Sequence, residues 1–327
     1  VPDPDRVQPR LFRPLGQLYF FMLYLWTGVN PVPFHILALL IHTTSAFLLT
    51  MLVWELLEDR LIAVATGMLY VGATSVHLDS LLWAVGIYEL GAALFFLLAL
   101  YLFVKKRSIL SAIAFAVALL FKESAIVLPA VVLCISISGG GRKPLLNRLT
   151  VAARTVWPHL IVTAVFLFLK ARGVSPLSFP ADHPYTVDLW GLHLLRNGYR
   201  YLAWIFQAIL PFSLPFHRMV NAGLFFLSLC GLVALGARLR RRTIKTGGNA
   251  PNSTTLPIWL MWCLAGIVPL VFLPNHAFRY YLTIPLPAFL VLFLLALDAA
   301  IERMVHDRRL RSRALAAAVG TCLLLST

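Results

Sequence analysis

Six charged or titratable side chains lie beside long apolar runs, where the cost of burial demands a reason for each of them. A Lys, Arg or Asp at the centre of a membrane helix costs roughly 2.5–3.5 kcal/mol on insertion scales. Cations can neutralise a phosphate, and a carboxylate can accept a proton from a hydroxyl. The set therefore fits a site for an anionic lipid head group with an acid–base residue nearby. Its members are Arg13 in RPLG, His77 and Asp79 in SVHLDSLLW, Lys122 and Glu123 in FKESAIVLP, and Arg279 in AFRYYLTIPL.

Each of these residues also has a structural interpretation. Lys122 and Glu123 could form a local ion pair at a helix junction. Arg279 could extend to the membrane interface, as basic side chains next to tyrosines do. His77 and Asp79 could cap the end of one helix or the start of the next. Taken one at a time, the residues therefore leave structure and function open.

A metal or cofactor site is not predicted. His77 and Asp79 stand two residues apart, and two ligands at this spacing are weak evidence for a divalent metal. The cysteines all lie inside apolar runs with no paired spacing, which indicates buried thiols. They are Cys134, Cys230, Cys263 and Cys322.

The composition shows what kind of molecule must position these groups. Of the 327 residues, 60% are hydrophobic and 13% are charged, with a formal net charge of +15. A soluble domain carries about 25% charged residues, so the chain is not expected to be a soluble globular, disordered or disulfide-scaffold protein. We predict one all-α, polytopic domain over residues 1–327, in contact with membrane lipids and with no nucleic-acid partner. The chain begins with Val and ends inside an apolar run, so truncation at both ends is expected.

About ten transmembrane helices are predicted from apolar runs near the roughly 20 residues that cross a bilayer. Basic clusters between these runs are expected to face the cytoplasm by the positive-inside rule. This assignment requires that the segments 15–28 and 189–212 lie along the interface without crossing. The predicted spans are 34–57, 61–81, 88–104, 108–121, 124–138, 156–170, 219–237, 256–273, 281–301 and an incomplete one from 314.

Under that topology the outward side carries most of the loops. Residues 1–33 and 171–217 form outward loops, each with an interfacial helix, and residues 219–327 supply the C-terminal helices. The inward side holds short basic turns. Loops carry function more often than the elements they connect, so the site is expected on the outer face.

Four stretches, in order, resemble one family. The run LFRPLGQLYFFMLYLWTGVNPVPFHILALLIHTTSAFLLTMLVWELL is similar to a segment of the GT-C membrane glycosyltransferases, in the O-mannosyltransferase-like group that often carries tetratricopeptide repeats. The stretch SVHLDSLLWAVGIYELGAALFFLLALYLF resembles the His-x-acid loop and following helix of that group. FKESAIVLPA resembles its Lys-Glu corner, and FRYYLTIPL its Arg-Tyr segment before a late helix. The likeness is best over residues 34–138.

The resemblance implies a GT-C fold and transfer of a sugar from a polyprenyl-phosphate donor to an acceptor hydroxyl on the extracytoplasmic side. Arg279 and Lys122 would hold the donor phosphate, while His77 and Asp79 would shape the sugar or acceptor pocket. Preorganised cations would stabilise the phosphate leaving group. The full set expected to bind substrate is Arg13, His77, Asp79, Glu89, Lys122, Glu123, Arg279 and Tyr280.

The catalytic base implied by the resemblance lies in the first outward loop. This chain begins shortly before the RPL turn, and Asp3 and Asp5 are the acidic residues left there. Either could be the base, or the true base could lie upstream. The sugar stays open, since Thr74 and Ser75 stand where the group commonly has a His-Pro pair.

Two rival functions remain at this point. A secondary transporter would also place ionisable groups in the membrane, but such proteins tend to show internal repeats, and none is found in this sequence. A non-catalytic polytopic subunit would fit the altered histidine motif. In each case the protein is expected in the plasma membrane of a prokaryote or the endoplasmic reticulum of a eukaryote.

Overall fold

The computed structural model describes residues 11–139, 144–174, 186–209, 251–305 and 307–326. Within these ranges the regular structure is entirely helical, and no strand occurs. The all-α prediction is confirmed for this part of the chain. Asp3, Asp5 and the predicted span 219–237 lie outside the described residues.

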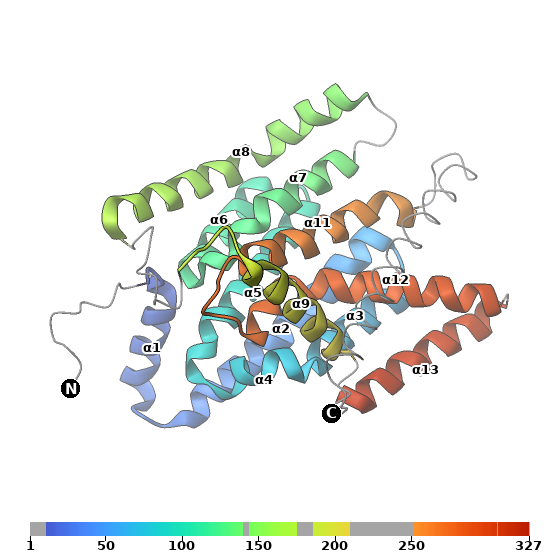
Figure 1. Ribbon diagram of the computed structural model, residues 1–327, viewed down its shortest axis with the longest axis horizontal. Helices are drawn as coiled ribbons and strands as arrows, with labels where there is room; N and C mark the ends of the chain where they lie inside the picture. Colours follow the sequence, from blue (N-terminus) through green and yellow to red (C-terminus); the bar gives the residue numbers. More distant parts are fainter. Residues whose placement is uncertain (1–10, 140–143, 175–185, 210–250, 306, 327) are drawn as a thin grey trace.

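Figure 1 shows the arrangement of the helices, which are joined by short connections from α1 to α7. The α-helices are α1 (Pro14–Thr27), α2 (Pro31–Leu57), α3 (Arg60–Gly72), α4 (Thr74–Leu82), α5 (Ile87–Val104), α6 (Ser108–Phe121), α7 (Leu128–Ser138), α8 (Leu145–Leu169), α9 (Leu192–Gln207), α11 (Pro251–Val271), α12 (Leu286–Met304) and α13 (Arg308–Ser326). Short helices of tighter or wider pitch are η1 (Ala84–Gly86), η2 (Glu123–Val127), η3 (Lys170–Val174) and η4 (Arg279–Thr283).

Local sequence signals set several of the helix ends. Proline stands in the first turn of α1 and α2, where its missing N–H would have had no helical partner. Asn30 caps α2 by accepting a hydrogen bond from the Val32 N–H at 3.1 Å, and Asp59 caps α3 by accepting one from the Ile62 N–H at 3.1 Å. Glu58 ends α2 in the left-handed conformation. These signals fix the tight turn that reverses the chain between α2 and α3.

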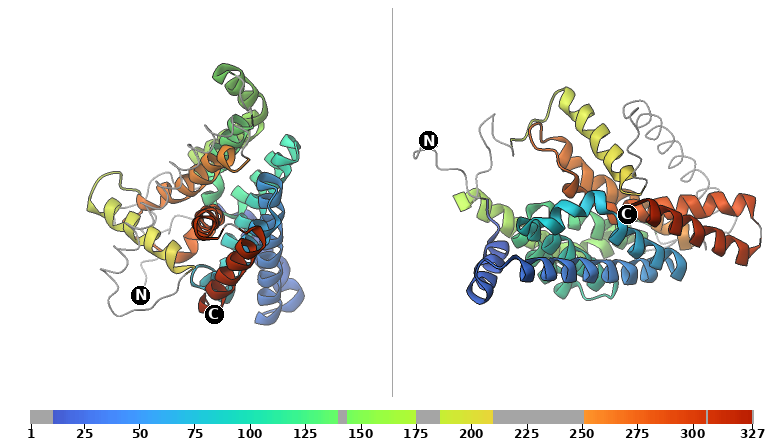
Figure 2. Two further views of the ribbon diagram at one scale, coloured as in Figure 1. Left: turned by 90° about the vertical axis from the view of Figure 1, so that its right-hand side faces the viewer. Right: turned by 90° about the horizontal axis from the view of Figure 1, so that it is seen from below.

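The core lies around α5. This helix packs against α2 on one side and α6 on the other, and α2 also packs on α3. The later helices join the same core, since α11 contacts α7 and α12, and α12 contacts α3 (Figure 2). Fully buried Leu49, Phe96, Phe115 and Trp262 come from four of these helices. Segments far apart in the sequence therefore share one apolar interior.

Among the described residues, three helices are long and apolar enough to cross a membrane. They are α2, the continuous stretch Ala84–Val104 that contains α5, and Leu145–Arg172 with α8. The pair α3 and α4 would make a fourth span, but it is bent by 53° at Ala73. Large apolar side chains such as Phe47 and Leu160 are exposed on these helices, as expected where lipid would cover them. Membrane-spanning character is thus supported, and the count of ten helices stays a prediction.

Most predicted spans in the described ranges correspond to observed helices with shifted ends. The prediction 108–121 coincides with α6, whereas the predicted 281–301 is divided by a break between η4 and α12. The observed α8 begins 11 residues before the predicted 156, at Leu145. The two segments predicted to lie along the interface correspond to α1, of 14 residues, and α9, of 16 residues. Both are shorter than the helices that could span.

Candidate functional site

The candidate site is built on the turn between α6 and η2. Helix α6 ends at Phe121, and Lys122 is extended, with φ −158° and ψ 138°. Glu123 then begins η2. Because successive side chains on an extended backbone point in opposite directions, Lys122 and Glu123 reach different partners.

Arg13 and Glu123 form a two-pronged ion pair. The Arg13 Nη2 donates to Glu123 Oε1 at 2.6 Å, and its Nε donates to Oε2 at 3.1 Å. The Arg13 side chain is 10% exposed, and it also lies 5.5 Å from the centre of the Tyr88 ring. Burial alone would raise the pKa of Glu123, but the charge and hydrogen bonds of Arg13, with the charge of Lys122, lower it to about 2. The pair ties the start of α1 to the α6–η2 turn.

Lys122 and Glu89 form a second, more deeply buried pair. The Lys122 Nζ donates to Glu89 Oε1, and both side chains are 5% exposed. The ammonium also lies over the Tyr281 ring at 4.2 Å and near the Tyr280 ring at 5.3 Å. Burial and the charge of Arg13 lower the pKa of Lys122, while the charge of Glu123 raises it. Glu89 stands in the first turn of α5, where the helix dipole favours a carboxylate.

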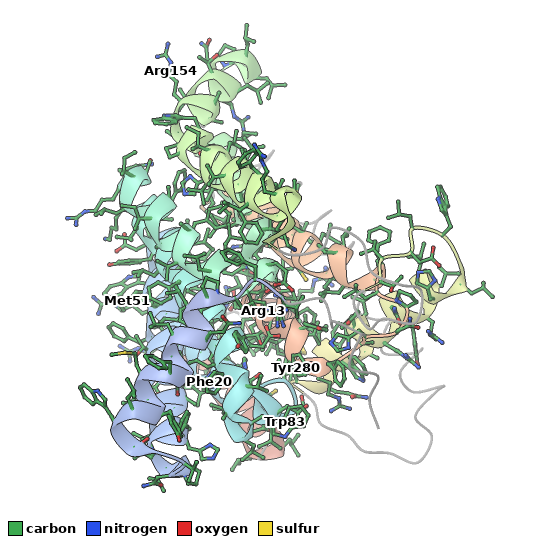
Figure 3. All side chains as sticks on the ribbon, turned by 90° about the vertical axis from the view of Figure 1, so that its left-hand side faces the viewer. Arg13, Phe20, Met51, Trp83, Arg154 and Tyr280 are labelled. Atoms are coloured by element: carbon green, nitrogen blue, oxygen red, sulfur yellow. The ribbon has the colours of Figure 1, made fainter. Side chains whose placement is uncertain are left out.

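These pairs border a small cavity of about 110 Å³, which we call the polar cavity. It brings together charged groups from α4, α5, the α6–η2 turn and the start of α1. Figure 3 looks onto this end of the molecule, and Arg13, Tyr280 and Trp83 lie one below another near the middle of the view. The lining residues are Arg13, Asp79, Ser80, Trp83, Val85, Gly86, Tyr88, Glu89, Lys122 and Tyr280.

A second cavity of about 300 Å³, which we call the apolar cavity, also includes Lys122 in its wall. Most of its lining is aliphatic or aromatic and comes from α8, α11, η2 and η4. Lys170 belongs to it as well, 5.7 Å from the Phe166 ring and with no carboxylate partner among the described residues. The lining residues are Leu11, Lys122, Glu123, Ser124, Ile126, Val127, Phe166, Leu167, Lys170, Val187, Gly266, Pro269, Leu270, Leu273, Tyr281 and Ile284.

Six of the residues expected from the sequence to bind substrate gather here. Five of them line the polar cavity, and Glu123 lines the apolar cavity while it binds Arg13. The five are Arg13, Asp79, Glu89, Lys122 and Tyr280. Four separate stretches of the chain therefore converge on one place.

Two expected residues are directed elsewhere. Arg279 donates from Nη2 to Gln207 Oε1 at 2.9 Å and lies 5.8 Å from the Trp204 ring, so it faces α9 and lines neither cavity. His77 is fully buried against the rings of His42 and Tyr70, whose centres lie 4.5 and 4.6 Å away, and it also lines neither cavity. A direct role for either side chain in substrate contact has no support from this geometry.

Trp83, Tyr88 and Lys170 are among the lining residues that were not singled out from the sequence. Trp83, 54% exposed, and Tyr88 stand in apolar stretches where aromatic residues are common. Lys170 ends the run FLFLK, which is also typical of a lysine that marks a helix end at the interface. The chain has many other aromatic and basic residues, and only the fold shows that these ones line a cavity.

Within the described ranges, no three His, Cys, Asp or Glu side chains gather in a way that could hold a metal ion. The expectation of no tightly bound metal stays a prediction. No protein-family model, curated protein or solved structure matches the chain. The geometry of the two cavities is therefore the main observation that bears on function.

Proposed function

We propose that this protein is a membrane glycosyltransferase of the GT-C type. It would move a sugar from a polyprenyl-phosphate donor to an acceptor hydroxyl on the extracytoplasmic side. The observation that carries the proposal is the position of Lys122, which lines both a polar and an apolar cavity. A lipid-linked sugar also has a polar part and an apolar part, because a polar ring is followed by a phosphate and then by an apolar chain.

The apolar cavity supports a place for the lipid chain. Leu270, Ile284 and Phe166 offer aliphatic and aromatic surface to an isoprenoid. Two cations, Lys122 and Lys170, line this cavity with a single carboxylate, Glu123, which Arg13 already engages. Because Lys122 is paired with Glu89, the positive charge that no described carboxylate neutralises is that of Lys170, and an anion bound here would lie against it and beside Lys122. A phosphate leaving group requires such preorganised charge more than it requires a proton.

The polar cavity supports a place for the sugar. The exposed indole of Trp83 offers a flat apolar face, and Arg13 and Asp79 offer hydrogen-bonding groups at its side. Polar groups placed among aromatic surfaces are typical of small-molecule sites. The sugar ring would then lie next to Lys122, with the anomeric carbon at the junction of the two cavities.

This assignment changes two roles expected from the sequence. The donor phosphate goes to Lys122 and Lys170, because the Arg279 guanidinium is engaged by Gln207. Arg279 would instead hold η4 against α9. His77 would support α4 from behind, since it packs between α2 and α3.

The experiment is donor turnover by the full-length protein in proteoliposomes, with a panel of polyprenyl-phosphate sugars. Release of free polyprenyl phosphate is measured for wild type, Lys122→Ala and Lys170→Ala. The matched control is Lys105→Ala, which removes an exposed lysine from the pair with Glu55. We expect turnover by wild type and the control, and its collapse in the two test variants. Lys122→Ala also leaves the buried Glu89 unpaired, so the deciding variant is Lys170→Ala, which breaks no ion pair among the described residues and should remain folded.

The rival functions predict different results. Uptake of the lipid-linked sugar across the membrane without release of polyprenyl phosphate would favour a transporter. No turnover and no uptake by a folded protein, complete at its N-terminus, would favour a non-catalytic subunit. Either result would overturn the proposal.

A further inference from the structure

Asp79 differs from the other carboxylates at the polar cavity because no cation neutralises it within the described residues. Glu89 is engaged by Lys122 and Glu123 by Arg13, whereas the Asp79 side chain has no hydrogen bond or ion pair in that part of the chain. Both cations that line the polar cavity are thus already engaged by other carboxylates. The Asp79 carboxylate has no such partner among the described residues.

Helix stability does not explain this carboxylate. Asp79 stands in the last turn of α4, and its carbonyl accepts a hydrogen bond from the Trp83 N–H at 3.0 Å. A negative charge near a helix C-terminus is disfavoured by typically 0.3–1 kcal/mol, because the dipole is negative there. The side chain therefore costs stability where it stands, which is common for groups kept for chemistry.

The surrounding elements fix where Asp79 lies. Trp83 follows it by one helical turn and lines the same cavity, so both side chains come from one face of the chain as α4 ends. Helix α4 also packs against η4, which contributes Tyr280 to the lining of the same cavity. Because the cavity is small, a group bound in it would be close to both Asp79 and Lys122.

We propose that Asp79 is the general base of the transfer, an inference that rests on the proposed glycosyltransferase function. The acceptor hydroxyl would lie against the Asp79 carboxylate, and the donor phosphate against Lys122. The hydroxyl oxygen forms a bond to the anomeric carbon as its proton passes to the carboxylate. The bond from the anomeric carbon to the phosphate oxygen breaks, and the electron pair leaves with the polyprenyl phosphate.

This assignment moves the base from the N-terminal loop to α4. Asp3 and Asp5 were expected to supply it from the family resemblance, and they lie outside the described residues. Asp79 stands in the same cavity as the cation proposed to bind the phosphate. The reaction would then have its base and its charge stabilisation on opposite sides of the anomeric carbon.

The test compares two surrogate nucleophiles in proteoliposomes of the full-length protein. Ethanol must lose a proton as it attacks, whereas azide is already an anion and needs no base. With the best donor of the panel, ethyl glycoside and glycosyl azide are measured for wild type and Asp79→Asn. Glu58→Gln is the control, because Glu58 is exposed at the far end of α2.

We expect Asp79→Asn to lower ethyl glycoside formation by about 10²–10⁴-fold, the usual contribution of a general base. Glycosyl azide formation should fall far less, and Glu58→Gln should match wild type in both assays. Equal losses with both nucleophiles would show a structural role and overturn the inference, as would unchanged transfer to ethanol. Absence of turnover by wild type with every donor would instead overturn the glycosyltransferase function on which the inference rests.

Discussion

At the residue scale, the site depends on two neighbours in the chain that serve two separate ion pairs. Lys122 binds Glu89 on α5, and Glu123 binds Arg13 before α1. The pairs differ from surface ion pairs because three of the four side chains are at most 10% exposed. Removing one member of such a pair leaves the other charge buried and unpaired.

Glu89→Gln should therefore destabilise the protein strongly. Loss of one partner of a buried pair typically costs about 3–5 kcal/mol, so the melting temperature in detergent should fall clearly. The control is Glu55→Gln, which breaks the pair with Lys105, where the side chains are 38% and 40% exposed. That change should cost at most about 1 kcal/mol. Equal effects of the two variants would show that the Glu89 pair is not buried in the folded protein.

Glu123 should give the protein a distinct response to acid. Its pKa is lowered from 4.5 to about 2 in the folded state, so its contribution to stability is complete above pH 4.5 and is lost as the pH falls toward 2. The shift corresponds to at most about 3 kcal/mol. Melting temperatures from pH 6 to about pH 3 should therefore fall less steeply for Glu123→Gln than for wild type. Parallel curves would contradict the Arg13–Glu123 pairing.

The sequence predicted the residues of the site better than their partners. Asp79, Lys122 and Glu123 could be singled out because charged groups beside apolar runs need a compensating interaction. Arg279 could not be separated from them, since its engagement by Gln207 depends on how α9 folds back on η4. The same limit applies to Lys170, whose place in the apolar cavity is set by contacts distant in sequence.

At the element scale, the turn from α4 into α5 forms part of the lining of the polar cavity. Gly86, in η1, approaches the backbone of Ser80 closely, and a Cβ built on it would lie 2.0 Å from the Ser80 carbonyl oxygen. Its φ of −60° is ordinary, so the need for glycine comes from this approach and not from strain. The contact sets the distance between α4 and the start of α5, and thereby between Asp79 and Glu89.

Gly86→Ala should displace α4 from η1. The backbone of Ser80 cannot yield as a flexible side chain would, so we expect a loss of about 1–3 kcal/mol and a strong loss of donor turnover. Gly320→Ala is the control, because a Cβ there meets nothing within 4 Å. It should be neutral or slightly stabilising, since alanine favours a helix over glycine by up to about 1 kcal/mol. A harmless Gly86→Ala would refute the close approach.

The sequence predicted the ends of a helix correctly where an apolar run is bounded by polar turns. Helix α6 matches its predicted bounds because Arg107 and Lys122 flank it. The break at Ala73 was missed, since α3 and α4 form one apolar run and their bend of 53° has no proline to signal it. The break also turns Asp79 toward the polar cavity, so the unpredicted bend matters directly for the proposed chemistry.

At the scale of the whole molecule, the arrangement separates a basic end from the end with the cavities. In Figure 1 the end of α7 and the start of α8 lie at the upper right, and the end of α12 and the start of α13 lie at the right-hand edge. Arg311 of α13 holds the last two helices together, since it binds Asp298 and lies 3.3 Å from Glu302, both on α12. Helix α1 lies at the opposite end (Figure 1). This polarity agrees with a topology in which the basic turns face the cytoplasm.

Topology can be tested by labelling single cysteines in a cysteine-free background. Arg107→Cys and Arg309→Cys should be protected from a membrane-impermeant maleimide in sealed cells, and both should react after permeabilisation. Asn30→Cys, in the exposed turn after α1, should react in both states. Reaction of Arg107→Cys and Asn30→Cys from the same side would contradict the proposed topology.

The most direct test of the central claim is to locate a bound lipid phosphate by photo-crosslinking. The full-length protein in proteoliposomes would be irradiated with a polyprenyl phosphate that carries diazirines along its chain, and the adducts mapped by mass spectrometry. We predict adducts at Phe166 and Leu270 of the apolar cavity. These adducts should disappear when excess polyprenyl-phosphate sugar competes and in the Lys122→Ala variant. They should persist in the presence of excess polyprenol. Adducts confined to lipid-facing residues such as Phe47, and unchanged by either competitor, would contradict the claim that the two cavities share one lipid-linked sugar.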